Sequence, residues 1–278
     1  MKLTVLIDNN TFIDRYFLAE PGVSYLIETG GQKILFDLGY SDAFILNARK
    51  LALDLLDIDS VVLSHGHIDH TGGLEPLLRL HLEAMIEGRP GKKAGLIAHP
   101  SAFLSRRIGS LPQVGSLLAE EKAADFFDIR LSKKPVQLTE RLFFLGEIER
   151  ENSFEGRQPM GKIREDGVEE DDFLLDDSAL AYRSDNGLVI IAGCAHAGIC
   201  NTVEQARRVC REERVVDIIG GLHLLDPPPL QLRQTVSCLK TLNLKALHAC
   251  HCTDLASKLA LAAAADLKEV GVGLTLEY

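Results

Sequence analysis

The sequence predicts an α/β protein made of two β/α halves, in which two sheets pack together and helices cover their outer faces. Three observations support this class. Strand and helix patterns alternate along most of the chain. Each half opens with a hairpin signal, Gly30-Gly31 in the first and Ser184-Asp185-Asn186-Gly187 in the second. The 278 residues, 46% of them hydrophobic, are enough for one large core or two smaller ones.

In the first half, short runs rich in Val, Ile and Leu predict strands, and apolar residues at helical spacing predict helices. Pro76 falls in the first turn of the longer helix, where proline is tolerated. Strands are predicted at 3–8, 24–29, 33–37, 60–63, 95–98 and 141–146, and helices at 43–53 and 74–87.

The second half follows the same plan, although no residue-level repeat is visible. Asn201 is a plausible N-cap for the helix that starts there. Strands are predicted at 179–183, 188–191, 215–219 and 246–249, and helices at 201–211, 230–242 and 254–270.

We expect one domain over residues 1–278, with halves at 1–146 and 178–278. Between them, 147–177 is polar and carries few structural signals. A loop this long inside a compact domain is usually functional, so this segment is expected to be an active-site loop. Its acidic run, 165–177, is either a solvated loop or a lid.

Charge and composition exclude several classes of protein. The chain has 30 Lys and Arg against 40 Asp and Glu, which is the reverse of the basic excess of most nucleic-acid binders. No 18-residue apolar stretch predicts a membrane span, and the N-terminus lacks the apolar core of a signal peptide. A cytoplasmic location is therefore expected. All six cysteines lie after residue 193 without a disulfide-framework pattern, so we expect thiols or metal ligands.

The strongest local signal is Ser64-His65-Gly66-His67-Ile68-Asp69-His70-Thr71-Gly72-Gly73. Three imidazoles and a carboxylate fall within six residues, between a buried strand and a helix. This donor set suits zinc, iron or manganese. The glycines let the backbone turn so that the ligands converge.

This segment resembles the H-x-H-x-D-H motif of the metallo-β-lactamase superfamily, and further landmarks of that family follow in order over the whole chain. The resemblance implies an αββα sandwich with two adjacent metals at the sheet edges. Zinc is the expected metal, with iron and manganese as alternatives. By the same resemblance, His65 and His67 would bind the first metal, Asp69, His70 and His251 the second, and Asp37 would hydrogen-bond within the metal loop.

The sequence departs from the family pattern at two places. No histidine occurs between His99 and His196, so the third-motif histidine is missing, and His196 or Asp177 must replace it. His196 is favoured, since a carboxylate at 177 would add charge beside Asp69. The fourth motif offers Cys194 in place of a bridging Asp; it is either a thiolate ligand or a buried apolar cysteine.

Other segments resemble the dihydropteroate-synthase-like branch of the superfamily. They include Gly146-Glu147-Ile148 with Phe154-Glu155, the run 193–199 with Asn201, and 219–224. The usual HCTG reads His251-Cys252-Thr253-Asp254 here. The branch implies pyrophosphate-releasing chemistry on a pterin. Two close divalent ions also favour hydrolysis of an ester, amide or phosphodiester. Both functions predict an anionic, phosphate-containing small molecule as the substrate.

Several other side chains are candidates for contacts with that substrate. His223 ends a strand and is either a general acid or phosphate donor, or a hydrogen-bonded structural histidine. Asp69 is also assigned a catalytic role, and His99 and Glu147 are substrate-binding candidates. His248 is expected in the core or behind the ligands. Cys250 and Cys252 are expected to point away from the His251 side.

The leading hypothesis is a dinuclear-metal hydrolase or pyrophosphate-releasing transferase. A non-catalytic metal or ligand sensor on the same fold and a diiron redox enzyme are the alternatives. Metal analysis discriminates, because zinc supports hydrolysis and iron with a visible absorption band supports redox chemistry. The expected partner is a small molecule, with neither nucleic acid nor membrane, and a homo-oligomer is left open.

Overall fold

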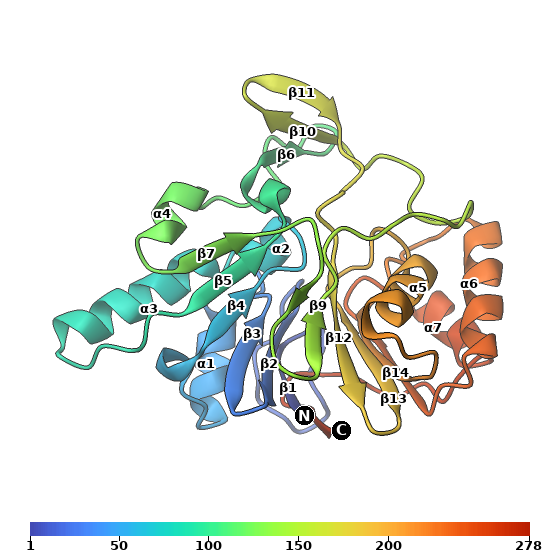
Figure 1. Cartoon of the computed structure of the whole chain (residues 1–278), viewed down its shortest axis with the longest axis horizontal. Helices are drawn as coiled ribbons and strands as arrows, with labels where there is room; N and C mark the ends of the chain where they lie inside the picture. Colours follow the sequence, from blue (N-terminus) through green and yellow to red (C-terminus); the bar gives the residue numbers. More distant parts are fainter. The chain divides into compact units, whose positions relative to one another are not determined.

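The computed structural model describes all residues, 1–278, and divides into two compact units (Figure 1). Unit 1 contains Met1–Ser132, Met160–Asp172 and Gly271–Tyr278, and unit 2 contains Lys133–Pro159 and Phe173–Val270. Neither unit is continuous in sequence. Residues 133–146 belong to unit 2, whereas 160–172 and the C-terminal residues belong to unit 1.

Unit 1 is built on a seven-stranded mixed sheet with the order β16-β1-β2-β3-β4-β5-β7. β3, β4, β5 and β7 run parallel, and the other neighbours pair antiparallel. The strands are β1 (Lys2–Ile7), β2 (Ser24–Thr29), β3 (Gln32–Phe36), β4 (Ser60–Val62), β5 (Gly95–Ala98), β7 (Asp128–Leu131) and β16 (Thr275–Glu277).

The predicted hairpin joins β2 to β3 at Gly30 and Gly31, whose φ values of 60° and 75° need glycine's freedom. The C-terminal β16 pairs with β1, and the Met1 ammonium group donates to the Tyr278 carbonyl at 2.7 Å. The two chain ends therefore lie together, as Figure 1 shows.

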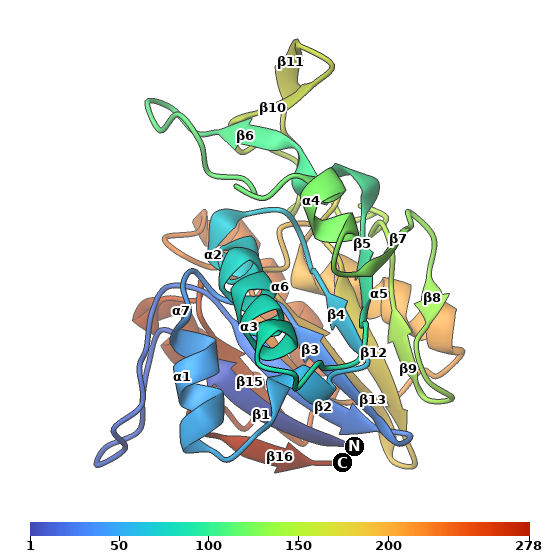
Figure 2. The ribbon, with the colours of Figure 1, turned by 90° about the vertical axis from the view of Figure 1, so that its left-hand side faces the viewer.

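Two helices, α1 (Ala43–Lys50) and α3 (Leu74–Ile86), pack on one face of this sheet (Figure 2). Phe44 of α1 and Leu77 of α3 are fully buried in one apolar cluster with Leu35 and Val61 of the strands. Burial of this apolar stripe stabilises the helices against the sheet. The remaining α-helices of this unit are the short α2 (Ile68–Thr71) and α4 (Glu120–Ala124), and two 3-10 helices cover Leu55–Asp57 and Pro100–Phe103.

A separate three-stranded sheet in unit 1 corrects the expectation of an unstructured loop over 147–177. It contains β6 (Ser105–Arg107), β10 (Lys162–Glu165) and β11 (Val168–Asp171), all antiparallel. Every residue of β11 is exposed, so no apolar alternation marks it in the sequence. Cross-strand ion pairs of Lys162 with Asp171 and Arg107 with Glu169 neutralise much of its acidic charge.

Unit 2 holds a six-stranded mixed sheet with the order β15-β14-β13-β12-β9-β8. β13, β14 and β15 run parallel, and the other pairs are antiparallel. The strands are β8 (Val136–Gln137), β9 (Leu142–Phe144), β12 (Ala179–Ser184), β13 (Gly187–Ala192), β14 (Val215–Gly221) and β15 (Ala246–Cys250).

The helices of unit 2 are α5 (Ile199–Cys210), α6 (Pro229–Thr241) and α7 (Leu255–Leu261). Val203, Leu239 and Leu261, one from each, are buried in a single apolar cluster with strand residues such as Ile190. Each unit therefore combines a mixed sheet with helices packed on one face, which confirms the predicted α/β class.

Several predicted helix bounds are wrong. The helix predicted over 43–53 ends at Lys50. Gly198, not Asn201, is the N-cap of α5, so the helix begins two residues earlier and Asn201 lies in its first turn. The predicted helix 254–270 ends at Leu261, and Asp254 is its N-cap. Alanines at 262–265 favour a helix, but Leu247 forms bridge contacts with the following segment, including Leu267, and these replace further helical turns.

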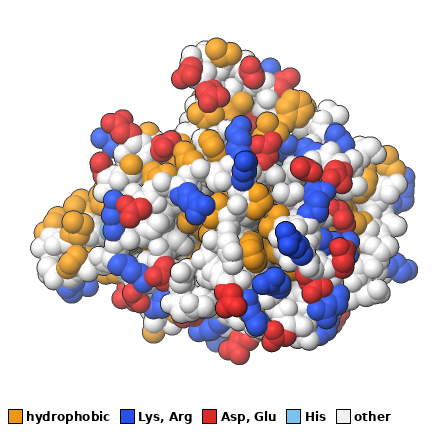
Figure 3. All heavy atoms as spheres, in the orientation of Figure 1, with side chains coloured by type: hydrophobic (Ala, Val, Ile, Leu, Met, Phe, Trp, Pro, Cys, Tyr) orange, Lys and Arg blue, Asp and Glu red, His pale blue; other side chains and the backbone are white.

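Acidic and basic side chains are interspersed over the face drawn in Figure 3. Exposed apolar side chains gather at its left edge, where α3 ends with Leu82, Met85 and Ile86. None of the helices has the length and hydropathy required to cross a membrane.

Candidate metal centre

The histidine-rich loop of unit 1 runs from the end of β4 into α2, and its ring nitrogens face one another. His67 occupies the N-cap position of α2 with extended backbone. The His65 Nε2 and His67 Nδ1 atoms are 3.1 Å apart, and the two rings meet edge to face. Both side chains are buried, His65 completely and His67 with 7% exposed. The loop therefore brings two imidazole nitrogens to one point away from bulk water.

This spacing tests whether the loop fits a metal. Two nitrogens bound to one tetrahedral ion at about 2.0–2.1 Å lie about 3.3 Å from each other. The 3.1 Å separation of His65 Nε2 and His67 Nδ1 is close to that value. Imidazoles beside a carboxylate are also the ligand types that zinc, iron and manganese accept. The residues of this loop fit a divalent transition metal.

Asp37 organises the loop from the end of β3. Its Oδ1 accepts from the Ser64 backbone N–H at 2.7 Å, and its Oδ2 accepts from the Ser64 hydroxyl at 2.6 Å. The same Oδ2 lies 2.7 Å from His70 Nδ1. A carboxylate on Nδ1 fixes the tautomer and presents Nε2 as the metal-binding nitrogen. His70 Nε2 in turn lies 3.7 Å from Asp69 Oδ2.

Close packing around the loop glycines explains why side chains are excluded there. A Cβ atom on Gly66 would lie 2.1 Å from Arg106 Nη1 and 2.2 Å from the Ala102 carbonyl oxygen. Arg106 is itself buried, and its Nε donates to Asp172 Oδ2 at 2.8 Å. Sequence reasoning missed this ion pair, because Arg106 and Asp172 are distant in the chain and neither belongs to a motif.

Unit 2 contributes the other predicted ligand side chains, Cys194, His196 and His251, each of which offers one ligand atom. Cys194 and His196 follow the end of β13, and His251 follows the end of β15. Cys194 and His196 are buried, with 3% and 9% exposed. Ala195 and His251 have positive φ values of 55° and 48°, so the chain turns sharply at both strand ends.

Asp177 supports the turn that carries His196. Its Oδ2 accepts from the Ala197 backbone N–H at 2.9 Å, while its buried Oδ1 has no hydrogen-bond partner in the chain. Burial raises the pKa of Asp177 to about 7, although the backbone N–H groups of Ala197 and His196 oppose that rise. Asp177 thus contacts the backbone of the His196 turn.

His223 lies against the His196 ring, with ring centroids 4.3 Å apart. Its Nδ1 is buried and has no hydrogen-bond partner in the chain. Burial lowers the pKa of His223, but the neighbouring Cys252 thiol outweighs this and raises it above the ordinary value.

The expectation that Cys252 points away from the His251 side is wrong. β15 ends at Cys250, so strand alternation no longer governs Cys252. Cys252 Sγ and the His251 ring lie beside the same residue, since a Cβ on Gly221 would be 2.6 Å from Cys252 Sγ and 3.2 Å from His251 Cδ2. The Sγ atom also accepts from the His223 backbone N–H at 3.3 Å. Burial alone would raise the pKa of this thiol, but hydrogen bonds with Cys194 and His223 hold it well below its usual value.

The remaining predicted residues make the following local contacts. His99 is buried, and its Nδ1 accepts from the Ser101 backbone N–H at 3.1 Å, which caps the 3-10 helix Pro100–Phe103. The Glu147 backbone N–H donates to the Lys133 carbonyl at 2.9 Å, which holds the chain after β9. His248 forms a buried pair with Asp217, Nδ1 to Oδ1, at 2.9 Å.

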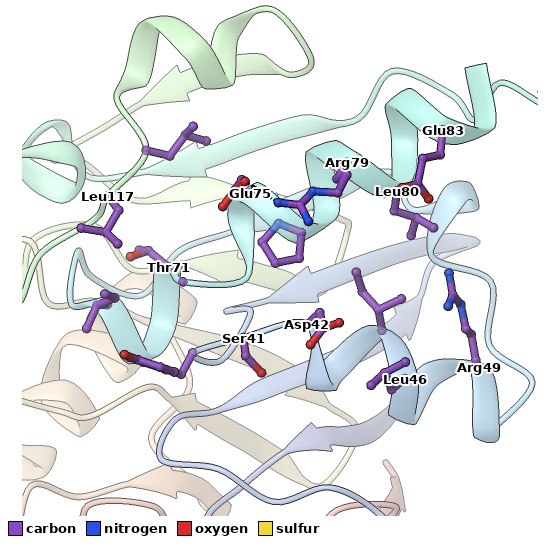
Figure 4. A pocket seen from close by; sticks show the side chains of 16 residues that line it. Ser41, Asp42, Leu46, Arg49, Thr71, Glu75, Arg79, Leu80, Glu83 and Leu117 are labelled. Atoms are coloured by element: carbon purple, nitrogen blue, oxygen red, sulfur yellow. Dashed lines mark hydrogen bonds and ion pairs between the residues drawn. The ribbon is translucent and has the colours of Figure 1, made fainter. Parts of the chain in front are cut away.

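Unit 1 also contains a cavity of about 630 Å³, shown in Figure 4. Side chains of α1 and α3 line it, including Arg49 and Glu83, and Thr71 of α2 reaches its edge. Glu75 and Arg79 form an ion pair at 2.6 Å in its wall. None of the metal-loop histidines lines it.

Known proteins resemble this chain over most of its length. Residues 18–99 match the family model described as the metallo-beta-lactamase superfamily. The 7,8-dihydropterin-6-methyl-4-(beta-D-ribofuranosyl)-aminobenzene-5'-phosphate synthase of Methanocaldococcus jannaschii is 30% identical over 267 residues, which is 91% of this chain and 87% of the relative.

Solved structures agree. Tm1679, a metal-dependent hydrolase of the beta-lactamase superfamily, matches with a TM-score of 0.84 and 26% identity over 100% of this chain and 99% of that one. YhfI from Bacillus subtilis, a metallo-beta-lactamase fold protein, matches with a TM-score of 0.58 at 12% identity, over 99% of each chain, and this likeness concerns the fold alone. With matching motifs, fold and relatives, the chain belongs to the metallo-β-lactamase superfamily.

Proposed function

We propose that this protein is a metal-dependent hydrolase or pyrophosphate-releasing transferase that acts on an anionic, phosphate-containing small molecule. The observation that carries the proposal is the buried histidine pair, with His65 Nε2 and His67 Nδ1 at a separation that suits a shared ion. Asp37 supports the proposal too, because its contact with His70 Nδ1 orients the His70 ring and leaves Nε2 as the metal-binding nitrogen. An orienting carboxylate is a feature of working metal sites.

We assign seven ligands to two divalent ions, with zinc as the expected metal: His65, His67, Asp69, His70, Cys194, His196 and His251. Imidazole and thiolate ligands suit zinc, and Cys194 would contribute the thiolate. Asp177 remains the alternative to His196. When bound, such ions would lower the pKa of a bound water and polarise a carbonyl or phosphoryl oxygen.

The chain's own side chains have separate tasks in this proposal. Asp37 keeps His70 in one tautomer and one orientation. Asp177 holds the backbone of the turn that carries His196. His223 is the candidate general acid, because its buried Nδ1 has no partner in the chain and a substrate oxygen can supply one. The raised pKa of His223 favours the protonated form that a general acid needs.

The phosphate-containing substrate class rests on the relative from Methanocaldococcus jannaschii. That relative is named as a synthase whose product joins a dihydropterin to an aminobenzene ribofuranosyl 5'-phosphate, and 91% of this chain aligns with it. A transferase of this kind displaces pyrophosphate from the pterin methylene carbon. A hydrolase would use water as the acceptor instead.

A substrate panel on the metal-loaded protein tests the proposal. The panel contains a generic phosphodiester, a lactone, a thioester, a β-lactam, and a dihydropterin-6-ylmethyl diphosphate with the aminobenzene ribotide as acceptor. We expect turnover of the phosphodiester or release of pyrophosphate, and loss of either in His67→Ala. The variant His81→Ala is the control, since His81 lies on α3 outside the metal loop. A β-lactam as the best substrate by a wide margin would contradict the substrate class.

Metal analysis separates the two alternative functions. A non-catalytic sensor would bind metal stoichiometrically and turn over none of the panel. A diiron redox enzyme would purify with iron and show a visible absorption band. Zinc with turnover of a phosphorylated substrate supports the proposal over both.

A further inference from the structure

Three consecutive side chains after β15 accept hydrogen bonds from one loop after β14. Cys252 Sγ accepts from the His223 N–H at 3.3 Å, and Thr253 Oγ1 accepts from the Leu222 N–H at 3.1 Å. Asp254 Oδ2 accepts from the Asp226 N–H at 2.7 Å. These atoms all belong to unit 2. We call residues 252–254 the clamp and residues 222–226 the His223 loop.

Backbone contacts reinforce this pairing in the opposite direction. The Asp254 N–H donates to the Leu224 carbonyl at 3.0 Å, and Leu224 forms a parallel bridge with Thr253. The side-chain and backbone bonds together account for four polar groups of a five-residue loop. Such a loop has little freedom to move its backbone.

The His223 loop has an unusual conformation that needs this support. His223 and Asp226 have φ values of 49° and 47°, in the left-handed region that side chains other than glycine rarely adopt. Residues other than glycine keep this backbone conformation only when contacts with the surrounding structure hold them in it. The left-handed turn at His223 sets the direction in which its ring leaves the chain, toward the His196 ring 4.3 Å away.

Asp254 makes the clamp stronger than the usual family motif allows. The sequence His251-Cys252-Thr253-Asp254 has Asp where the resembling branch has Gly. Its two carboxylate oxygens accept from two places, Oδ2 from Asp226 and Oδ1 from the Ser257 N–H at 2.7 Å, which caps α7. A glycine would supply neither acceptor.

We propose that Cys252, Thr253 and Asp254 are positioning residues that fix the His223 loop and thereby aim the His223 ring at the substrate. This inference rests on the proposed function, because it needs His223 to act on a substrate. Thr253 and Asp254 reach the His223 loop through its backbone N–H groups, whereas Cys252 contacts both the backbone and the side chain of His223, so the clamp acts through His223.

Hydrogen exchange of the metal-loaded protein tests the clamp without any substrate. In Thr253→Val and Asp254→Gly, we expect the amides of residues 222–226 to exchange roughly three- to tenfold faster, which is the range for one lost hydrogen bond. Metal content should stay at the wild-type value. Thr241→Val is the matched control, because its hydroxyl bonds to Cys238 at the end of α6. Wild-type exchange of the loop in both clamp variants would overturn the clamp.

Kinetics on the substrate that the panel identifies tests the positioning role. We expect Thr253→Val and Asp254→Gly each to lower kcat about tenfold with little change in KM, and Cys252→Ser to be milder than Cys252→Ala. In a His223→Gln background, the clamp substitutions should lower kcat hardly any further, because the residue they position is already gone. If they lower kcat in that background as much as they do in the wild type, the inference is overturned. Absence of turnover in every panel reaction would count against the proposed function, while the exchange measurement would still decide the clamp.

Discussion

Oε1 of Glu155 accepts a hydrogen bond at 2.7 Å from the backbone N–H of Asn201, which lies in the first turn of α5. The N-cap of that helix is Gly198, which has no side chain to cap it. Glu155 supplies the missing acceptors from a distant part of the chain, since its Oε2 also accepts from the Cys200 N–H at 3.3 Å. A carboxylate at a helix N-terminus is doubly favourable, because it satisfies unpaired N–H groups and faces the positive end of the helix dipole.

Asn201 completes the connection in the other direction. Its Oδ1 accepts from the N–H groups of Glu151 and Asn152 at 3.0 Å, and its Nδ2 donates to the Ala197 carbonyl at 2.7 Å. The segment 151–155 and the turn 195–198 are therefore joined by side chains, and that turn carries the candidate ligand His196. This is the physical reason why Glu155, Gly198 and Asn201 occur together as sequence landmarks.

The first prediction concerns Glu155 and Gly198. A Cβ on Gly198 would lie 2.2 Å from the Glu155 Cδ, and Gly198 has a φ of 99°, so Gly198→Ala should destabilise the protein by about 2–4 kcal/mol through displacement of the carboxylate and backbone strain. Glu155→Ala should cost about 1–3 kcal/mol. Urea denaturation of both variants and of the double variant measures their coupling. The double variant should lose less unfolding free energy than the two single variants lose in total. A loss equal to that total would contradict direct contact between the two residues.

The second prediction concerns the pH dependence of stability. Burial raises the pKa of Glu155 above its ordinary value, although hydrogen bonds from Asn152, Asn201 and Cys200 oppose the rise. The native state then holds this proton more tightly than the unfolded state. Its contribution to stability is fully present below the unfolded pKa of about 4.3 and is lost as the pH rises through the native pKa.

Glu155→Gln removes this titration. The free energy of unfolding of the wild type minus that of the variant should therefore decrease as the pH rises above about 4.3, as measured by urea denaturation at each pH. All other groups titrate in both proteins and cancel in the difference. A difference that stays constant or increases with pH would show that the Glu155 pKa is not raised.

The third prediction is the metal content. Purified, metal-supplemented protein should approach two equivalents per chain by elemental analysis, and His67→Ala should lose at least one. Asp37→Ala should weaken metal affinity about 10- to 100-fold, since it leaves His70 Nδ1 without its carboxylate. His81→Ala should match the wild type. A wild type that stays at one equivalent after supplementation would contradict the dinuclear site.

The fourth prediction compares His196 with Asp177. Asp177 Oδ2 is already used by the Ala197 N–H, whereas His196 offers an imidazole nitrogen of the kind that zinc prefers. His196→Ala should therefore lose metal, and Asp177→Asn should keep more of it. Elemental analysis of the two variants, side by side, decides the assignment. Loss of metal in the Asp177 variant alone would move the ligand role to Asp177.

The fifth prediction concerns His223. His223→Gln should retain both metals and lower kcat by roughly 10²- to 10⁴-fold, which is the typical cost of a lost general acid. Steady-state kinetics and elemental analysis of the same preparation test both parts. Loss of metal from this variant would identify His223 as a ligand instead.

The sequence by itself determined the regular elements that bury an apolar pattern. β2 and β5 have the predicted bounds, 24–29 and 95–98, because buried strands are marked by local runs of apolar residues bounded by turn signals. It also determined the spacing of His65, His67, Asp69 and His70, since four ligands within six residues share one loop whatever the rest of the chain does.

Tertiary structure alone decided the features that depend on distant partners. β11 is exposed along its length and exists because β10 pairs with it, so its own residues carry no strand pattern. Glu155 caps α5, and Cys252, Thr253 and Asp254 bond to the His223 loop, through hydrogen bonds between residues 28 to 46 positions apart. Each bond depends on where two separate strand ends or loops meet, and local residue preferences do not contain that information.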